Sequence, residues 1–411
     1  MKNIIVHKKV FSLFCAITLL LCSIFTPMAV SGFSVFSIDK VWDGTTADAF
    51  AGGEGTKEKP YEISNGSELH KMATSGAAGT KGKYYKLTAD IYLNNVADDD
   101  WKSKNPNEWS SKAFYGHLDG DSHVIYGAYR VTAATKGNDA WSALLINTYC
   151  GDASATDEPS VSIKNLGIEN SYFQGKFAGA ILGKVDSGDK GYANFTMENC
   201  YAGADVEVNG SSYCGGLIAS IYEKKNITIN NCYFTGTLRG QTNNAYKAAL
   251  VGYIEGAKEV LETISISNCY AATTDTNAVV SRKESAQYVK YTNVYGTAPG
   301  HASAIGITVI TKDQMTGEDA KTNMIGLDFE NVWRTVIGRT PRLSKPDEPS
   351  AKVWDGTTAT DFAGGEGTKE SPYLISNGAQ LHKMAISGAA ATKGKYYKLT
   401  ADIYLNNVAD D

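Results

Sequence analysis

The residues best suited to metal chemistry are four polar side chains that alternate along the chain, His117, Asp119, Asp121 and His123. Alternate residues of a regular strand share one face, so these imidazoles and carboxylates would converge as metal ligands do. The Asp119-Gly120 pair, however, is a turn signal, because Asp side chains bond to nearby backbone N–H groups. We therefore predict a structural turn in this segment and no metal site.

Two acidic segments, Asp98–Asp100 and Asp186–Gly191, offer oxygen ligands that calcium prefers. A calcium loop supplies six or more such ligands at a fixed spacing, and neither segment has the spacing of a known loop. Exposed acidic turns are usually solvated by water. We therefore predict that the protein uses no cofactor, with calcium as the alternative.

Catalytic motifs are missing from the sequence. Gly-x-Ser-x-Gly, a phosphate loop and His-Glu-x-x-His do not occur. β-Helical lyases use basic residues beside calcium-bound carboxylates, and Lys and Arg are sparse in the repeats of this chain. We assign no catalytic residue and predict that the chain is not an enzyme.

Aromatic side chains in a polar setting are the strongest binding candidates. Trp101 and Trp109 lie in the polar segment 98–111, and exposed rings of this kind stack on sugars while polar neighbours bind hydroxyls. These two residues form the predicted glycan site. Four repeated tyrosines could serve the same purpose, but we favour a structural stack for them: Tyr172, Tyr201, Tyr233 and Tyr270.

The N-terminal segment has a basic start, an apolar run over Val10–Phe25 and small residues at 29–32. This pattern predicts a secretory signal peptide over residues 1–32, because the run is too short to span a bilayer and Pro27 interrupts it. No later run is long enough to span a membrane. The net charge of −5 argues against nucleic acid as a partner. We expect a secreted or cell-surface protein.

A long internal repeat divides the chain. Val41–Asp99 recurs as Val353–Asp411, with 51 of 59 positions identical. Because Asp411 corresponds to an early position of the first copy, we expect the sequence to be a fragment that stops within a second module. The predicted organisation is a signal peptide (1–32), a first module (33–343), a linker (344–352) and a truncated second copy of the module start (353–411).

Each copy begins with a helix and a strand. Asn65 followed by Glu68 predicts a capped helix that ends near Gly76. The alternation of apolar residues from Tyr85 to Leu93 predicts one strand with a buried face. We expect this lead-in to precede the main repeats.

A shorter repeat follows, in which two alternating apolar residues precede Asn, a small residue and Tyr. It occurs five times, at Leu166–Tyr172, Phe195–Tyr201, Ile227–Tyr233, Ile264–Tyr270 and Val289–Tyr295. A second pattern, opened by an aromatic residue, lies between them at Phe177–Val185, Tyr213–Ile221 and Tyr246–Ile254. Repeats of 25 to 37 residues made of short strands predict an all-β fold, a right-handed parallel β-helix. A β-propeller is the alternative.

The repeat also predicts the interior. Cys200, Cys232 and Cys269 share one position and should form an inward ladder, flanked by Ser171 and Val294. The odd number of cysteines in the exported chain argues against a disulfide framework. The asparagines should stack at the bends and satisfy backbone groups there.

These motifs resemble a known repeat. Gly216-Leu217-Ile218-Ala219 followed by Ile227–Tyr233 is similar to the GLUG repeat of bacterial surface proteins, which include some large secreted peptidases. Motifs of the lead-in and of the closing stretch 315–343 extend the resemblance over Val41–Leu343, although no copy reads Gly-Leu-Val-Gly in full. The resemblance implies a secreted, surface-associated β-helical protein and no particular activity.

Together these patterns favour a bacterial cell-surface protein that attaches to a host surface protein or an extracellular glycan. A stalk that displays other modules is one alternative. Part of an extracellular polysaccharide-degrading enzyme or peptidase is the other. The discriminating features would be an aromatic and polar groove for binding, and a cleft that gathers carboxylates with Lys or Arg for catalysis.

Overall fold

The computed structural model describes residues 41–149, 161–186, 194–222, 226–240, 246–255, 264–273, 278–282, 289–297, 306–344, 354, 356–400, 403 and 405. The predicted signal peptide, nearly all of the predicted linker, Cys150 and residues 187–191 lie outside the described residues.

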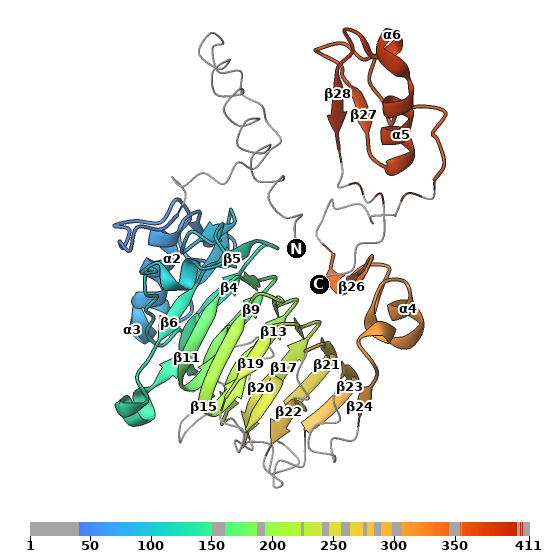
Figure 1. Cartoon of the computed structure of the whole chain (residues 1–411). Coiled ribbons are helices and arrows are strands. Elements are labelled where there is room, and N and C mark those ends of the chain that lie inside the picture. Colours follow the sequence, from blue (N-terminus) through green and yellow to red (C-terminus); the bar gives the residue numbers. More distant parts are fainter. Residues whose placement is uncertain are drawn as a thin grey trace, which may run out of the picture. The chain divides into compact units, whose positions relative to one another are not determined.

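The main body is built from two large parallel sheets (Figure 1). The first sheet has 14 strands among the described residues. They are β1 (Tyr61–Ile63), β2 (Tyr84–Leu87), β3 (Ile91–Tyr92), β4 (His117–Asp119), β5 (Val124–Tyr126), β9 (Val161–Lys164), β10 (Gly167–Glu169), β13 (Phe195–Glu198), β14 (Tyr201–Ala202), β17 (Ile227–Asn230), β18 (Tyr233–Phe234), β21 (Ile264–Ala271), β23 (Val289–Gly296) and β24 (Ile307–Val309).

The second sheet has ten strands in the same part of the chain. They are β6 (Tyr129–Val131), β7 (Trp141–Ser142), β8 (Leu145–Tyr149), β11 (Tyr172–Gly179), β12 (Leu182–Asp186), β15 (Glu207–Gly215), β16 (Ile218–Ile221), β19 (Thr237–Arg239), β20 (Lys247–Ile254) and β22 (Ala278–Arg282). The chain leaves the first sheet for the second and returns once in each repeat, so equivalent strands of successive repeats pair in parallel.

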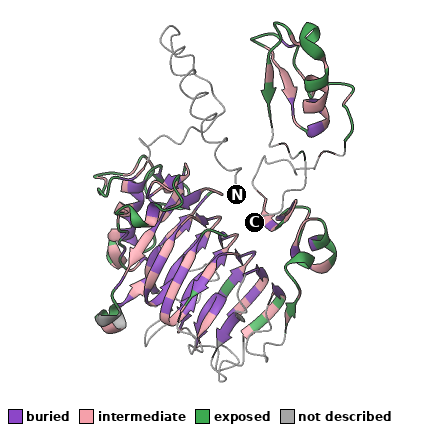
Figure 2. Cartoon of the chain, viewed as in Figure 1, coloured by how far each residue is buried: buried purple, intermediate pink, exposed green. Residues whose placement is uncertain are grey.

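The core lies between the sheets, and its strands are buried along most of their length (Figure 2). Parallel pairing places like residues beside like, as where Ile227 pairs with Phe195 in one repeat and with Ile264 in the next. The aliphatic positions predicted to face inward are fully buried at Met197, Ile229 and Ile266. The fold is therefore mostly β, with parallel sheets, as the repeat spacing predicts.

The lead-in contains the predicted helix, α2 (Gly66–Thr74), followed by α3 (Gly76–Thr80). The Asn65 side chain accepts a hydrogen bond from the Glu68 N–H at 3.0 Å, which confirms the predicted cap. The predicted single strand over 85–93 is wrong. It is divided into β2 and β3, because residues 88–90 form the corner at which the chain changes from one run of the first sheet to another.

A short irregular segment closes the body. It comprises the 3₁₀ turn η5 (Asp313–Met315), α4 (Asp319–Asn323) and the antiparallel hairpin of β25 (Trp333–Val336) and β26 (Arg339–Leu343). Two further 3₁₀ segments, η2 (Trp101–Ser103) and η3 (Ala134–Asp139), lie in connections between strands.

The second copy of the lead-in has the same elements as the first. They are β27 (Tyr373–Ile375), α5 (Gly378–Ile386), α6 (Gly388–Thr392) and β28 (Tyr397–Leu399). Within the described part of the chain, no helix is both long enough and apolar enough to cross a bilayer.

Candidate binding site beneath the closing hairpin

A ladder of asparagines forms one corner of the repeats. Asn199 donates to the side-chain oxygen of Asn165 at 2.8 Å, and Asn231 donates to that of Asn199 at 3.0 Å. The ladder members have positive φ angles, which Asn tolerates better than other non-glycine residues. They are Asn165, Asn199, Asn231, Asn268 and Asn293. The predicted Asn column is confirmed from Asn199 onward, although Asn268 donates to the neighbouring Asn230 and not to Asn231.

The first member of this column differs from the sequence prediction. The ladder uses Asn165, with Gly167 paired to Tyr201, so the segment in register begins at Val161 and not at Leu166. The segment Leu166–Tyr172 matches the same pattern five residues later and belongs to the next corner. Tyr172 therefore lies in the second sheet, where its ring stacks on Tyr129 at 5.5 Å.

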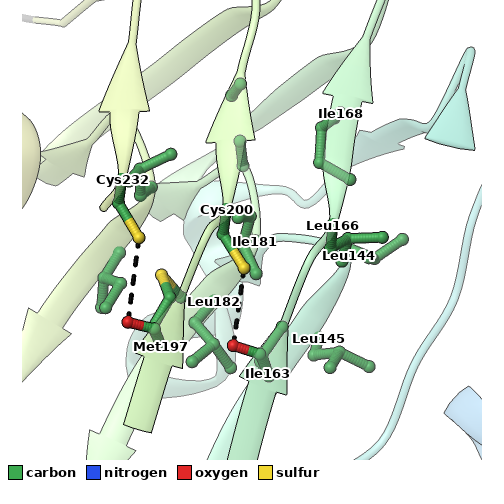
Figure 3. Close-up of a cluster of buried hydrophobic side chains, with 14 of the residues drawn as sticks. Leu144, Leu145, Ile163, Leu166, Ile168, Ile181, Leu182, Met197, Cys200 and Cys232 are labelled. Atoms are coloured by element: carbon green, nitrogen blue, oxygen red, sulfur yellow. Dashed lines mark hydrogen bonds between the residues drawn. The ribbon is translucent and has the colours of Figure 1, made fainter. Parts of the chain in front are cut away.

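Inside this corner, the predicted cysteine ladder is confirmed. Cys200, Cys232 and Cys269 are fully buried, and the backbone N–H of Cys232 lies 3.3 Å from the Cys269 sulfur. The ladder is flanked by Leu166 and Val294 in register, so the prediction of Ser171 at its end is wrong. Figure 3 shows the Cys200 and Cys232 thiols directed at the carbonyl oxygens of the preceding repeat.

Burial suppresses the reactivity of the Cys232 thiol. It raises the pKa of Cys232 well above its usual value, and neighbouring Cys200 and Cys269 raise it further. Burial likewise raises the pKa of Cys214, in the second sheet, to about 12. Because the thiolate is the reactive form of cysteine, neither Cys232 nor Cys214 is a nucleophile at neutral pH. The ladder cysteines are buried and pack the core.

On the outer side of the same corner, tyrosines form a column. The rings of Tyr201, Tyr233 and Tyr270 stack with centroids 4.7 and 5.0 Å apart and planes within 4° of parallel. Tyr295 continues the register in the next strand. The predicted structural stack is therefore confirmed for these three tyrosines.

The closing segment covers one end of this tyrosine column. The Tyr270 hydroxyl donates to the carbonyl oxygen of Pro341, and Tyr295 donates to that of Ile325. The Trp333 ring packs against Tyr270 at 5.6 Å. These contacts hold the β25–β26 hairpin over Tyr233 and Tyr270. The edge of the hairpin at Arg342 and Leu343 lies on the side of Tyr201.

The tyrosine column ends at Gly167. This residue occupies the tyrosine position of its repeat, since it pairs with Tyr201. A Cβ atom at Gly167 would lie 2.6 Å from the Tyr201 hydroxyl oxygen, so only glycine leaves room for that ring. The missing side chain opens a hollow between the end of the column and the hairpin.

We call this hollow the hairpin pocket, and its volume is about 370 Å³. The first sheet contributes Val124, Tyr126, Gly167, Glu169 and Tyr201 to its wall. The ladder asparagines Asn165 and Asn199 and the exposed Asp205 lie on the same side. The hairpin and the residues beside it contribute Asn331, Val332, Arg334, Arg342, Leu343 and Ser344.

Opposite charges face each other across the hairpin pocket. Burial lowers the pKa of Arg342, but Tyr233, Glu169, Tyr201 and Tyr270 together raise it by more, so the guanidinium stays charged. Burial raises the pKa of the Tyr201 hydroxyl, and the Glu169 charge adds to this effect. Burial raises the pKa of Tyr126 too, with Asp90 adding to it. At neutral pH the hairpin pocket therefore offers neutral phenols that donate and accept hydrogen bonds, together with the half-buried guanidinium of Arg342.

The expectation that Trp101 and Trp109 expose their rings is wrong. Trp101 is 6% exposed and Trp109 is 1% exposed. The indole N–H of Trp109 donates to the carbonyl oxygen of Leu144 at 2.8 Å, and its ring packs edge-on against Trp42. Polar neighbours in sequence suggested a loop in solvent, whereas Trp109 packs on the lead-in and Trp101 packs against Tyr129 of the second sheet.

The four alternating polar residues do not converge. His117 stacks on Tyr84 at 4.1 Å, whereas His123 contacts Asp90 at 3.1 Å. Asp119 accepts a hydrogen bond from the Asp121 N–H at 2.8 Å, as predicted for a turn. The alternation ends because β4 ends at Asp119. The described residues contain no group of three or more His, Cys, Asp or Glu side chains placed to hold a metal ion.

The acidic segment Asp98–Asp100 is exposed and carries its own counter-ion. Lys104 contacts the Asp98 carboxylate at 3.0 Å and that of Asp100 at 2.8 Å. The second acidic segment, 186–191, is described only at Asp186.

Sequence reasoning did not identify the hairpin pocket. Its residues are dispersed from Ser122 to Ser344, and Gly167 carries no motif. The usable signal was an absence, namely that the repeat containing Asn165 lacks the tyrosine present in the four later repeats.

No family model matches the chain. It is 36% identical over 89 residues to halomucin of Haloquadratum walsbyi, a match to 20% of this chain and 1% of that protein. It is 26% identical over 159 residues to a "Putative Gly-rich membrane protein" of Evansella cellulosilytica, a match to 39% of this chain and 17% of that protein. The chain therefore spans a small part of the length of these relatives.

Among solved structures, a crystal structure of a "putative immunoglobulin A1 protease" from Bacteroides ovatus is similar over 72% of this chain and 96% of that chain, with 20% sequence identity. The TM-score is 0.41, and at that level the likeness supports no inference about this chain.

Proposed function

We propose that this protein is a secreted, cell-surface binding module with a right-handed parallel β-helix of GLUG-like repeats, and that it binds an extracellular glycan in the hairpin pocket. The fold supports the architecture, because each repeat visits both sheets and pairs in parallel with the next. The hairpin pocket is the observation that carries the binding role.

The chemistry of the hairpin pocket suits a sugar. Small-molecule sites combine apolar walls with a few converging polar groups. Here Val124, Val332 and the half-buried ring of Tyr126 provide apolar surface. Arg342, Glu169 and the ladder asparagines provide donors and acceptors for hydroxyl groups. The volume of about 370 Å³ suits one or two sugar rings.

Binding of the full chain to a glycan array, followed by titration of any glycan retained, tests this role. We expect Arg342→Gln and Tyr126→Ala to weaken binding at least tenfold, since each removes a group that lines the hairpin pocket. Arg339→Gln is the matched control, because it removes the same charge from an exposed position of the same hairpin. Retention of no glycan, or equal binding by all three variants, contradicts the proposal. If the chain binds a host surface protein and no glycan, that result supports attachment to protein as the alternative.

A second function has one observation in its favour. Glu169 and Asp205 come from successive repeats, and both line the hairpin pocket together with Arg334 and Arg342. A pair of carboxyl groups is typical of enzymes that hydrolyse glycosidic bonds. Release of new reducing ends from a bound glycan would support this function. In that case Glu169→Gln should abolish turnover and leave binding within about threefold.

A further inference from the structure

The second lead-in has the same local fold as the first. Tyr373 pairs with Tyr397 as Tyr61 pairs with Tyr85. The Asn377 side chain caps α5 by accepting from the Gln380 N–H at 3.0 Å. The two copies therefore present equivalent surfaces. The contacts of the first copy show what this surface can bind.

In the first copy, residues 107–121, which we call the cover segment, lie across the lead-in. Trp109 packs against Trp42 and His70, with both centroid distances 5.4 Å. The backbone N–H of Lys112 donates to the carbonyl oxygen of Ala73 at 2.8 Å. These contacts close the helical side of the lead-in.

The cover segment then adds a strand to the sheet side of the lead-in. Tyr115 donates through its backbone N–H to the Thr80 hydroxyl at 2.9 Å. Strand β4 pairs in parallel with β2, so that Tyr84 faces His117 and Tyr85 faces Leu118. Asp121 finally contacts Lys86 at 2.9 Å. The lead-in is therefore completed by a strand that it does not contain.

The second lead-in retains every residue that makes these contacts. Trp42, His70, Ala73, Thr80, Tyr84, Tyr85 and Lys86 recur as Trp354, His382, Ala385, Thr392, Tyr396, Tyr397 and Lys398. The eight positions that differ between the copies are all elsewhere, at residues 48, 49, 59, 62, 67, 68, 74 and 79 of the first copy. The receiving surface is thus unchanged.

In the part of the chain that the structure describes, no segment covers this surface of the second lead-in. Leu399 is 56% exposed, whereas the equivalent Leu87 is fully buried. Tyr396 is 49% exposed, and Thr392 has lost the complete burial of Thr80. Among the described residues, β28 pairs only with β27, whereas β2 pairs with both β1 and β4.

We propose that the second lead-in is an acceptor site for a polypeptide strand with the pattern of the cover segment, an aromatic residue at the position of Trp109, another at that of Phe114 and an aliphatic residue at that of Leu118. The partner adds in parallel to the edge of β28 that has no partner strand among the described residues. Main-chain hydrogen bonds hold it there. Its first aromatic side chain covers the α5 surface, and its second packs on Tyr397, as Phe114 packs on Tyr85 at 5.9 Å in the first copy. A partner of this chemistry fits because the same surface receives such a strand in the first copy.

A peptide with the sequence of residues 107–121 tests the proposal when it is added to the full chain. We expect one bound peptide per chain, because the first lead-in is already occupied by its own cover segment. Hydrogen exchange should slow at residues 397–399 when the peptide is present. A peptide with alanine at the positions of Trp109 and Phe114 should bind at least tenfold more weakly.

Matched protein variants separate binding from folding. Leu399→Asp should weaken peptide binding at least tenfold without unfolding the second lead-in, because that side chain is exposed. Ala390→Asp adds the same charge at a position that is exposed in both copies and should bind normally. Equal binding by the two variants would overturn the proposal.

Weak affinity of a free peptide is addressed by joining it to the C-terminus through a flexible glycine-serine linker, which raises its effective concentration to about the millimolar range. If residues 397–399 exchange equally fast with the joined peptide and with its alanine variant, the proposal is wrong.

Discussion

The two lead-ins share 51 of 59 residues and differ sharply in burial. In the first copy, Leu69, Met72 and Leu87 are fully buried. In the second copy, the equivalents Leu381 and Met384 are half-buried and Leu399 is exposed. The comparison teaches that local sequence fixes the helix, its cap and the strand pair, whereas a distant segment decides whether their apolar face belongs to a core.

The largest expected difference between the copies concerns their equivalent leucines. Leu87→Asp places a charge in the core and should destabilise the body by about 4 kcal/mol or more. Leu399→Asp should change the free energy of unfolding by no more than about 0.5 kcal/mol, because its side chain is exposed. Denaturant unfolding of the two variants measures this. Similar losses in both would show that the second copy is also covered in solution.

Removing the cover of the first copy should make it resemble the second. Trp109→Ala leaves a large cavity against Trp42 and His70 and should cost about 3–5 kcal/mol. Hydrogen exchange should accelerate at residues 84–87 toward the rate seen at 396–399. Full stability of this variant, with loss of glycan binding, would instead place Trp109 in a glycan site.

The caps should behave alike in the two copies, because capping is local. Asn65→Ala and Asn377→Ala each remove one acceptor from a helix N-terminus and should each cost about 1 kcal/mol. Helix content and local hydrogen exchange of α2 and α5 measure the effect. A cost confined to the first copy would mean that the cap acts through the cover segment.

The smallest expected effect is on the pH dependence of the first lead-in. Burial lowers the pKa of His70 below its usual value of 6.5. The unfolded state therefore binds the proton more tightly, and the stability of the first lead-in should fall as the pH drops through and below about 6.5. Unfolding midpoints at pH 7.5 and 5.5, compared with those of His70→Gln, measure it. A steeper loss in the variant than in the wild type would contradict this role for His70.

Much of the repeat could be read from the sequence. The spacing of Asn and Cys predicted both ladders, because parallel strands of successive repeats place equivalent residues beside each other. The same spacing predicted the wrong register in the first repeat, where the pattern begins at Val161 and not at Leu166. Two asparagines, Asn165 and Asn170, each follow an alternating apolar pair, and both adopt positive φ. Only pairing with Tyr201 shows that Gly167 holds the column position.

The candidate site could not be predicted in the same way. Its wall combines Tyr126, Glu169 and Tyr201 from different strands with Arg342 from a hairpin far along the chain. Trp109, in contrast, was predicted as a site residue because it lies among polar residues in the sequence. It is nevertheless only 1% exposed.

By itself, the sequence determined the repeat period, the buried positions within each strand and the capped helices, because these depend on residues close together in the chain or equivalent between repeats. Only the tertiary structure decided which copy of the lead-in is covered, where the tyrosine column ends and which charges meet in the hairpin pocket. Those outcomes depend on contacts between segments that share no pattern, and burial by a distant segment is not encoded in the residues that become buried.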